Sequence, residues 1–98
     1  MPGTHAPRMV GLDGKSIEIV FRPLRKGNAR GIIDPPETLN RKIVVDSRLR
    51  RVERLEVLVH EFLHAIAWWL DEAYVTKWAA DIARELWALG LRWKDEDE

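Results

Sequence analysis

Residues 55–72 contain the feature that most constrains this chain: the sequence His-Glu-Phe-Leu-His at positions 60–64. Six apolar residues recur around it at helical spacing, namely Leu55, Leu58, Val59, Phe62, Leu63 and Ile66. This spacing predicts an amphipathic helix, on which His60 and His64 project from one face, one turn apart. With three His and nine Glu in 98 residues, a His-Glu-x-x-His match arises by chance with a probability on the order of 1%. The rest of the chain is therefore expected to pack around this helix.

The two histidines and the glutamate between them have the residue types of a metal site. Two neutral imidazoles one turn apart can bind one Zn²⁺ at about 2.0–2.1 Å each. Glu61 follows the first histidine directly, where a general base for a water on the metal belongs. The chain has no cysteine, so only His and carboxylate ligands are available, as in catalytic zinc sites. The simpler alternative is two core histidines beside an incidental glutamate.

Composition limits the chain to one small domain of ordinary apolar content, 46%. Residues 1–54 hold 12 Lys/Arg and 6 Asp/Glu, whereas residues 55–98 hold 4 and 10. These opposite charges predict that the two halves attract each other within one domain. The alternative is a nucleic-acid-binding surface on the basic half, although the sequence contains no nucleic-acid-binding motif. No apolar stretch reaches the length of a membrane span or a signal peptide, so we expect a cytoplasmic protein.

The ends of the chain are expected to differ from the domain between them. Residues 1–14 are rich in Pro and Gly, which predicts a flexible N-terminal segment with His5 in an exposed tail. Residues 94–98 read as an acidic, solubilising tail. A single domain is expected over residues 15–93.

Three stretches have the pattern of strands: residues 16–22, 29–34 and 41–46. Residues 24–28 between the first two, which include Arg25 and Lys26, are expected to form a basic turn or loop. The second stretch contains Gly31 and ends at Pro35-Pro36, which suits the edge of a sheet. Such an edge could pair with an extended peptide substrate. With two helices to follow, the fold class expected is α+β.

Two helices are expected, over residues 52–69 and 72–89, because one unbroken helix would be about 57 Å long. The break is placed near Leu70-Asp71, with Asp71 as N-cap and Leu70 and Val75 as a hydrophobic staple. Gly90 is a stop signal. The second helix has an apolar stripe of Val75, Trp78, Ala79, Ile82, Leu86 and Leu89.

A catalytic zinc takes a third protein ligand, and the leading candidate is Glu72. In one continuous helix Glu72 would lie about 12 Å beyond His64. With the break, the second helix folds back and Glu72 can face the motif histidines. Asp71 is better explained as a cap, and Asp81 and Glu85 lie further along the helix, but each remains an alternative.

Three stretches carry a resemblance to a known family: residues 55–66 with the motif, residues 70–75 (Leu-Asp-Glu-Ala-Tyr-Val) and residues 79–83 (Ala-Ala-Asp-Ile-Ala). They resemble the small HExxH metallopeptidase-like proteins of phages and prophages and are similar, more broadly, to minimal zincins of the gluzincin type. The resemblance implies a small, mostly antiparallel sheet on the motif helix and hydrolysis of peptide bonds. It also implies His60, His64 and Glu72 as zinc ligands and Glu61 as the base.

The function expected from the sequence is thus that of a zinc-dependent metallohydrolase, a peptidase acting on peptides or proteins. Two alternatives remain open: a zinc-binding structural or regulatory module without proteolytic activity, and a nucleic-acid-associated protein that uses residues 22–54.

Overall fold

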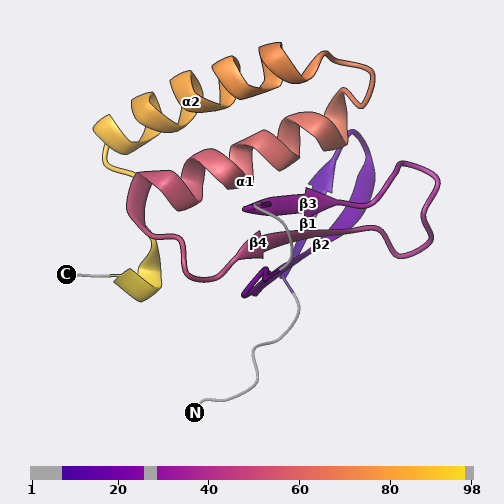
Figure 1. Cartoon of the computed structure of the whole chain (residues 1–98), viewed down its shortest axis with the longest axis horizontal. Helices are drawn as coiled ribbons and strands as arrows, with labels where there is room; N and C mark the ends of the chain where they lie inside the picture. Colours follow the sequence, from indigo (N-terminus) through magenta and orange to yellow (C-terminus); the bar gives the residue numbers. More distant parts are fainter. Residues whose placement is uncertain (1–7, 26–28, 97–98) are drawn as a thin grey trace.

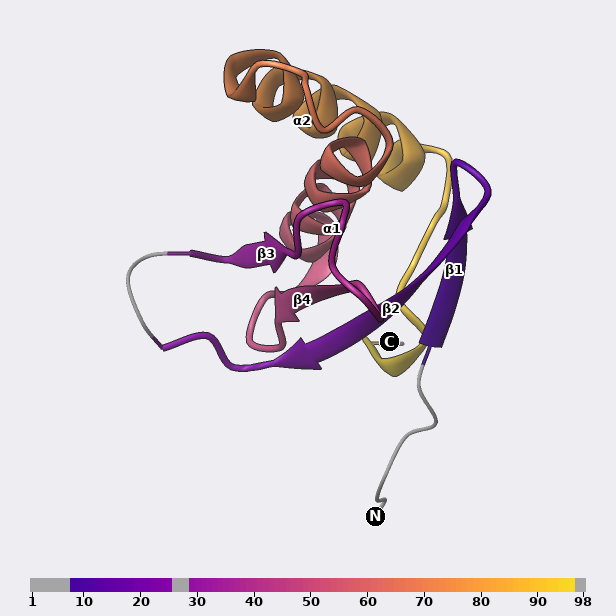
Figure 2. The same cartoon turned by 90° about the vertical axis from the view of Figure 1, so that its right-hand side faces the viewer.

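The computed structural model describes residues 8–25 and 29–96, which form one sheet and two helices. The elements, in chain order, are β1 (Arg8–Leu12), β2 (Lys15–Arg22), β3 (Gly31–Ile33), β4 (Lys42–Asp46), α1 (Arg51–Ile66), α2 (Glu72–Ala88) and the short 3₁₀ helix η1 (Lys94–Glu96). Figures 1 and 2 show that α1 lies between the sheet and α2. The helix that carries the histidine motif is therefore the central element of the fold.

The sheet has four strands in the order β1-β2-β4-β3, and it is mixed. The pairs β1–β2 and β3–β4 are antiparallel, whereas β2 and β4 are parallel. The α+β class is confirmed, but the expectation of a three-stranded, mostly antiparallel sheet is wrong. β3 lies at an edge of the sheet, as its Gly and neighbouring Pro residues predicted.

The additional strand, β1, belongs to the segment 1–14 that was expected to be flexible. Asp13 and Gly14 both have positive φ, 53° and 73°, and link β1 to β2 as a two-residue hairpin turn. Asp-Gly is favoured in such turns because both positions need positive φ. The expectations for His5 and for residues 26–28 lie outside the described residues, as do residues 97–98 of the acidic tail.

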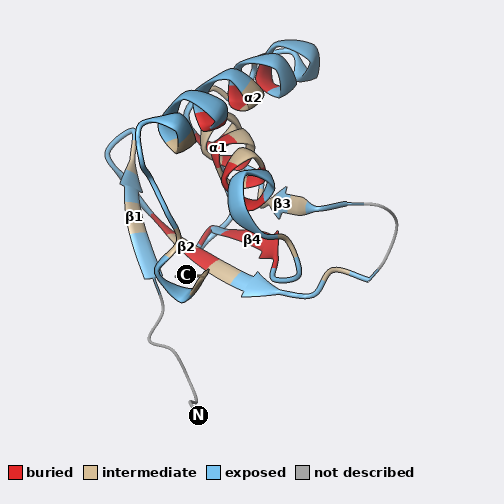
Figure 3. Cartoon of the chain, turned by 90° about the vertical axis from the view of Figure 1, so that its left-hand side faces the viewer, coloured by how far each residue is buried: buried red, intermediate tan, exposed pale blue. Residues whose placement is uncertain are grey.

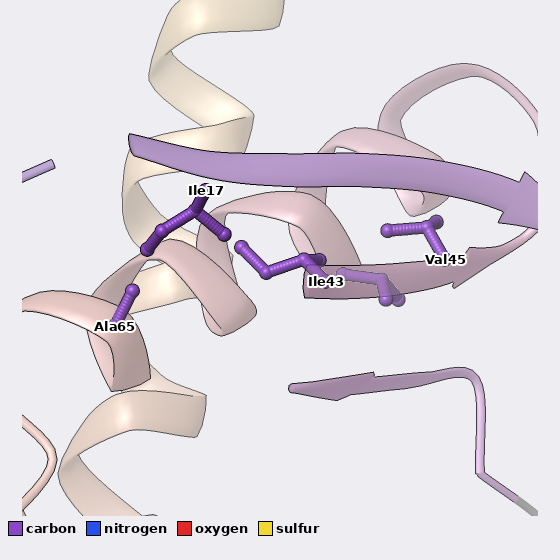
Figure 4. Packing of buried hydrophobic residues seen from close by; sticks show 5 residues of the cluster. Ile17, Ile43, Val45 and Ala65 are labelled. Atoms are coloured by element: carbon purple, nitrogen blue, oxygen red, sulfur yellow. The ribbon is translucent and has the colours of Figure 1, made fainter. Parts of the chain in front are cut away.

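The apolar core lies on both sides of α1 (Figure 3). Between the sheet and α1 the buried residues are Ile17, Ile43, Val45, Val57 and Ala65, and Figure 4 shows how Ala65 of α1 approaches the strands. Between α1 and α2 they are Leu55, Val59, Ala79 and Ala83. Because both sides of α1 are covered, its position between the two layers is fixed. None of the helices in the described part of the chain is long and apolar enough to cross a membrane.

The face that α2 buries differs in part from the predicted stripe. Val75, Ala79 and Ala83 are completely buried, whereas Trp78 and Ile82 are 42% and 40% exposed. Small side chains let the backbones of α1 and α2 approach closely, so alanines rather than the larger residues form the contact. The predicted break is confirmed, because Asp71 is the N-cap of α2 and its side chain accepts a hydrogen bond from Ala73 N.

The N-terminus of α1 is capped by residues from the other end of the chain. Its N-cap residue, Arg50, makes no side-chain capping bond. Instead the Glu96 carboxylate accepts from Arg51 N, at 2.9 and 3.1 Å. Nearby, Arg54 donates to both oxygens of Asp95, each at 3.0 Å. Residues 94–96 of the predicted acidic tail are therefore attached to the domain.

Replacing Glu96 by Ala should lower the free energy of unfolding by about 1 kcal/mol, the usual cost of losing an N-terminal helix cap. Chemical denaturation followed by circular dichroism measures the effect. The matched control is Glu85→Ala, since Glu85 is exposed on α2. Equal stability of the two variants would contradict a capping role for Glu96.

Candidate metal centre

Three side chains converge where α2 begins beside the second half of α1. The Nε2 atoms of His60 and His64 lie 3.2 Å apart. Each also contacts an oxygen of Glu72: Oε2 is 3.0 Å from His60 and Oε1 is 2.9 Å from His64. Each pair of these side chains is in contact, so the three candidate ligands form a triangle, here called the ligand triangle, in which Glu72 offers a different oxygen to each histidine.

Local sequence explains how Glu72 reaches the histidines. α1 ends at Ile66, and the amide of Ala67 closes its last turn by donating to Leu63 O. Asp71 then starts α2, so Glu72 falls in the first turn of a helix that folds back along α1. Because the chain turns between the two helices, Glu72 contacts His64 although it lies eight residues further along the chain.

The competing carboxylates have other partners or lie elsewhere. Asp71 bonds to the backbone of its own helix, and Asp81 pairs with Arg84 at 2.7 Å. Among the residues that the structure describes, the group able to hold a metal consists of His60, His64 and Glu72, without Glu85. The three residues favoured as ligands from the sequence are therefore those that lie together.

The triangle has nearly the dimensions that a tetrahedral zinc site needs. With zinc–ligand bonds of about 2.0–2.1 Å, neighbouring ligand atoms should be separated by about 3.3 Å. The two histidine nitrogens lie 3.2 Å apart, close to this value, and each lies 2.9–3.0 Å from a different oxygen of Glu72. Two imidazole nitrogens and one carboxylate oxygen are also a common catalytic donor set. The residues present therefore fit a zinc ion.

Burial changes the acidity of groups at this centre. Glu61 is 6% exposed, and burial, with a further contribution from the charge of Glu72, raises its pKa from 4.5 to about 7. Burial is also the main cause that lowers the pKa of His60, although the Glu72 carboxylate acts in the opposite direction. Near neutral pH, His60 is thus held in the uncharged form that binds metals, and Glu61 can exchange a proton.

A cavity of about 470 Å³ opens over the three ligand atoms. Besides Glu61 and the ligand triangle, its lining residues are Gly31, Ile33 and Trp68. The first two belong to the edge strand β3, which therefore forms one wall. Trp68 follows His64 by four residues, and on the helix predicted to run to residue 69 this spacing could have placed it beside the histidines, although α1 itself ends at Ile66.

Gly31 lies where β3 comes closest to the motif helix. A Cβ atom at this position would be 2.7 Å from Val57 Cγ1 and 2.9 Å from Glu61 Oε2. Both separations are shorter than van der Waals contact, so the sequence requires glycine here for close approach rather than for an unusual φ.

Replacing Gly31 by Ala should lower the free energy of unfolding by about 1–3 kcal/mol, because β3 and α1 must move apart. Gly11→Ala is the matched control, since a Cβ there meets nothing within 4 Å and Gly11 also lies in an edge strand. Urea denaturation of both variants measures the difference. If the two variants were equally stable, the close approach of β3 to α1 would be refuted.

Comparison of the chain with protein-family models, curated proteins and solved structures finds no match. Its function must therefore be inferred from the chemistry of the centre itself.

Proposed function

We propose that this chain is a zinc-dependent metallohydrolase that cleaves peptide bonds. The observation that carries the proposal is the convergence of His60, His64 and Glu72 beside the buried carboxyl of Glu61. The resemblance of residues 55–83 to the phage-type metallopeptidase-like proteins agrees with it. By the same resemblance, the fold is assigned to the minimal zincins.

Hydrogen bonds alone do not account well for the triangle. To hold the Glu72 side chain by hydrogen bonds, each imidazole must donate its Nε2–H to one of the two oxygens. Neither Nε2 then has a lone pair that could accept a hydrogen bond across the 3.2 Å between the two nitrogens. A single cation held by three lone pairs removes this conflict. The close approach of the two nitrogens is therefore compatible with a bound metal, which His60, His64 and Glu72 would hold.

In the proposed reaction, Glu61 moves the protons. Zinc, when bound, supplies Lewis-acid polarisation of the substrate carbonyl and makes the attacking water more acidic. Glu61 takes a proton from that water and delivers it to the leaving amine nitrogen. Without metal, burial raises the pKa of this carboxyl to about 7, and a bound cation nearby would lower it and so favour the carboxylate form that takes a proton from water.

The wall formed by β3 supports an extended substrate. Among the described strands β3 pairs with β4 alone, so its outer edge offers backbone groups that could bind another extended chain. Gly31 and Ile33 on this strand line the same cavity as the ligand triangle. A peptide that adds to this edge would bring its backbone carbonyls next to the metal centre.

A second candidate function is a zinc-dependent structural module. The observation in its favour is that the proposed ligands join α1 to α2, so a bound metal would also connect the two helices. Such a module needs zinc for stability but has no use for a buried base at Glu61. The Glu61 substitution in the Discussion distinguishes the two functions.

Metal content of the purified protein tests the proposal. We expect one zinc per chain, and Glu72→Ala should weaken zinc binding by on the order of 100-fold or more, since even the loss of an outer-shell partner costs 10–100-fold. Asp71→Ser is the matched control, because serine retains the helix cap but removes the neighbouring carboxylate. Competition with a chelator measures both affinities. Failure of the wild type to bind zinc after reconstitution would overturn the proposal.

A further inference from the structure

Arg41, immediately before β4, is a buried cation with an unused hydrogen-bond donor. Its side chain is 7% exposed. Nε donates to Asp34 O at 2.8 Å, and Nη1 makes a long contact of 3.5 Å to Ala65 O. Nη2 is buried without a hydrogen-bond partner. Within residues 8–25 and 29–96, Arg41 Nη2 is the one buried side-chain nitrogen or oxygen that has no hydrogen-bond partner.

This arrangement lacks the negative charge that usually accompanies a buried arginine. No ion pair between described residues includes Arg41, whereas the buried Arg54 is paired with Asp95. The two backbone carbonyls that contact Arg41 orient its guanidinium, but each carries only a partial negative charge. One of them, Ala65 O, lies in the last turn of α1, where the helix dipole favours a cation. A buried guanidinium is ordinarily paired with a carboxylate, and an unpaired donor costs free energy. The position of Arg41 therefore suggests a missing anion.

Trp68 connects Arg41 to the metal centre. The guanidinium carbon lies 5.6 Å from the centroid of the Trp68 ring. The same ring is 6.3 Å from the centroid of His64 and lines the cavity over the ligands. Trp68 lies in the turn between α1 and α2, outside both helices, and is 43% exposed. The Trp68 ring thus lies next to both the guanidinium and the cavity, and a change of its rotamer would not require either helix to move.

We propose that Arg41 recognises a carboxylate of the substrate, and that Trp68 turns aside to expose Nη2 to it. This inference rests on the proposed peptidase function, for which it names the substrate class. The Arg41 guanidinium carbon lies 5.6 Å from the Trp68 centroid, which lies 6.3 Å from the His64 centroid. The distance from the guanidinium to the His64 ring is therefore at most the sum of these two. At about 3.3–3.6 Å per residue, three to four residues of extended peptide span the greatest distance that these separations allow. The carboxylate therefore lies within about four residues on one side of the bond that is cleaved.

Such a carboxylate can be the C-terminus of a chain or the side chain of Asp or Glu. Three small probes separate these sources: N-acetyl-Ala-Ala, its C-terminal amide, and N-acetyl-Ala-Asp with an amidated C-terminus. Binding to the metal-free protein is measured by nuclear magnetic resonance titration. We expect N-acetyl-Ala-Ala to bind about tenfold more tightly than its amide, as a charge-assisted hydrogen bond provides. Tight binding of the third probe would extend recognition to acidic side chains, and weak binding would restrict it to chain ends.

Arg41→Gln should abolish the preference for the carboxylate over the amide, whereas Arg84→Gln, which removes an exposed arginine from α2, should leave it unchanged. Equal binding of acid and amide to the wild type, or an unchanged preference in Arg41→Gln, would overturn the inference. If Arg41→Gln fails to fold, the Nε–H resonance of Arg41 in the wild type decides: it must shift with the acid and not with the amide. Because the protein is metal-free, failure of zinc binding or turnover is detected separately.

Discussion

Replacing Glu61 by Gln should lower peptide hydrolysis by the zinc-loaded protein by about 10²–10⁴-fold, the range that a general acid–base contributes. Glutamine retains the shape of the side chain but cannot take a proton from water or return it to the leaving amine. Because Glu61 is not one of the three converging ligand residues, the zinc content should not change. Turnover of a peptide mixture followed by mass spectrometry, with elemental analysis of the same samples, measures both quantities.

Glu56→Gln is the appropriate control for this prediction. Glu56 lies on the same helix but is not among the residues that line the cavity. The control should therefore retain full activity. If Glu61→Gln were as active as Glu56→Gln, Glu61 could not be the proton carrier. If neither the wild type nor the variants cleaved any peptide while zinc removal unfolded them, the structural zinc module would be the better function.

The ligand triangle could be predicted because its geometry depends on local sequence. A helix fixes the direction of His60 and His64 from their spacing alone. The length limit of a small domain and the capping residue Asp71 then determine where the chain must turn, which places Glu72. Each of these steps uses residues close together in the sequence.

What could not be predicted depends on contacts between distant segments. The cap that Glu96 provides for α1 joins residues 45 positions apart in the chain. The sequence around Arg50 does not show that the cap of this helix comes from a distant segment. The buried face of α2 was predicted only in part: Ala79 was included but Ala83 was missed, because a hydrophobic stripe is recognised mainly by its large residues. Arg41 likewise appears in the sequence as an ordinary charged residue at the start of a strand.

The strand count was wrong for a different reason. The Asp13-Gly14 signal for a hairpin turn was present in the sequence, with an apolar Val10 and Leu12 before it. The high Pro and Gly content of residues 1–14 outweighed this signal. A specific turn dipeptide beside alternating residues is thus more informative than the average composition of the segment around it.

Without metal, Glu61 should make the protein less stable as the pH rises. Its pKa is raised from 4.5 to about 7 in the folded state, so folding favours the protonated form. The stabilisation is fully present below pH 4.5, is lost as the pH rises toward 7, and is absent above that value. A difference of this size corresponds to roughly 3 kcal/mol in the free energy of unfolding.

Glu61→Gln provides the comparison that isolates this effect, because glutamine has no charge at any pH in the range. The variant should gain roughly 3 kcal/mol over the wild type between pH 4 and pH 8, measured by urea denaturation in the presence of a chelator. His60 also titrates, but it is common to both proteins and its contribution largely cancels. A difference between variant and wild type that did not change with pH would mean that Glu61 has an ordinary pKa. Glu61→Gln is therefore expected both to stabilise the metal-free protein at high pH and to inactivate the enzyme. Both effects have one cause, because the buried carboxyl that can exchange a proton near pH 7 is also the group whose ionisation opposes folding.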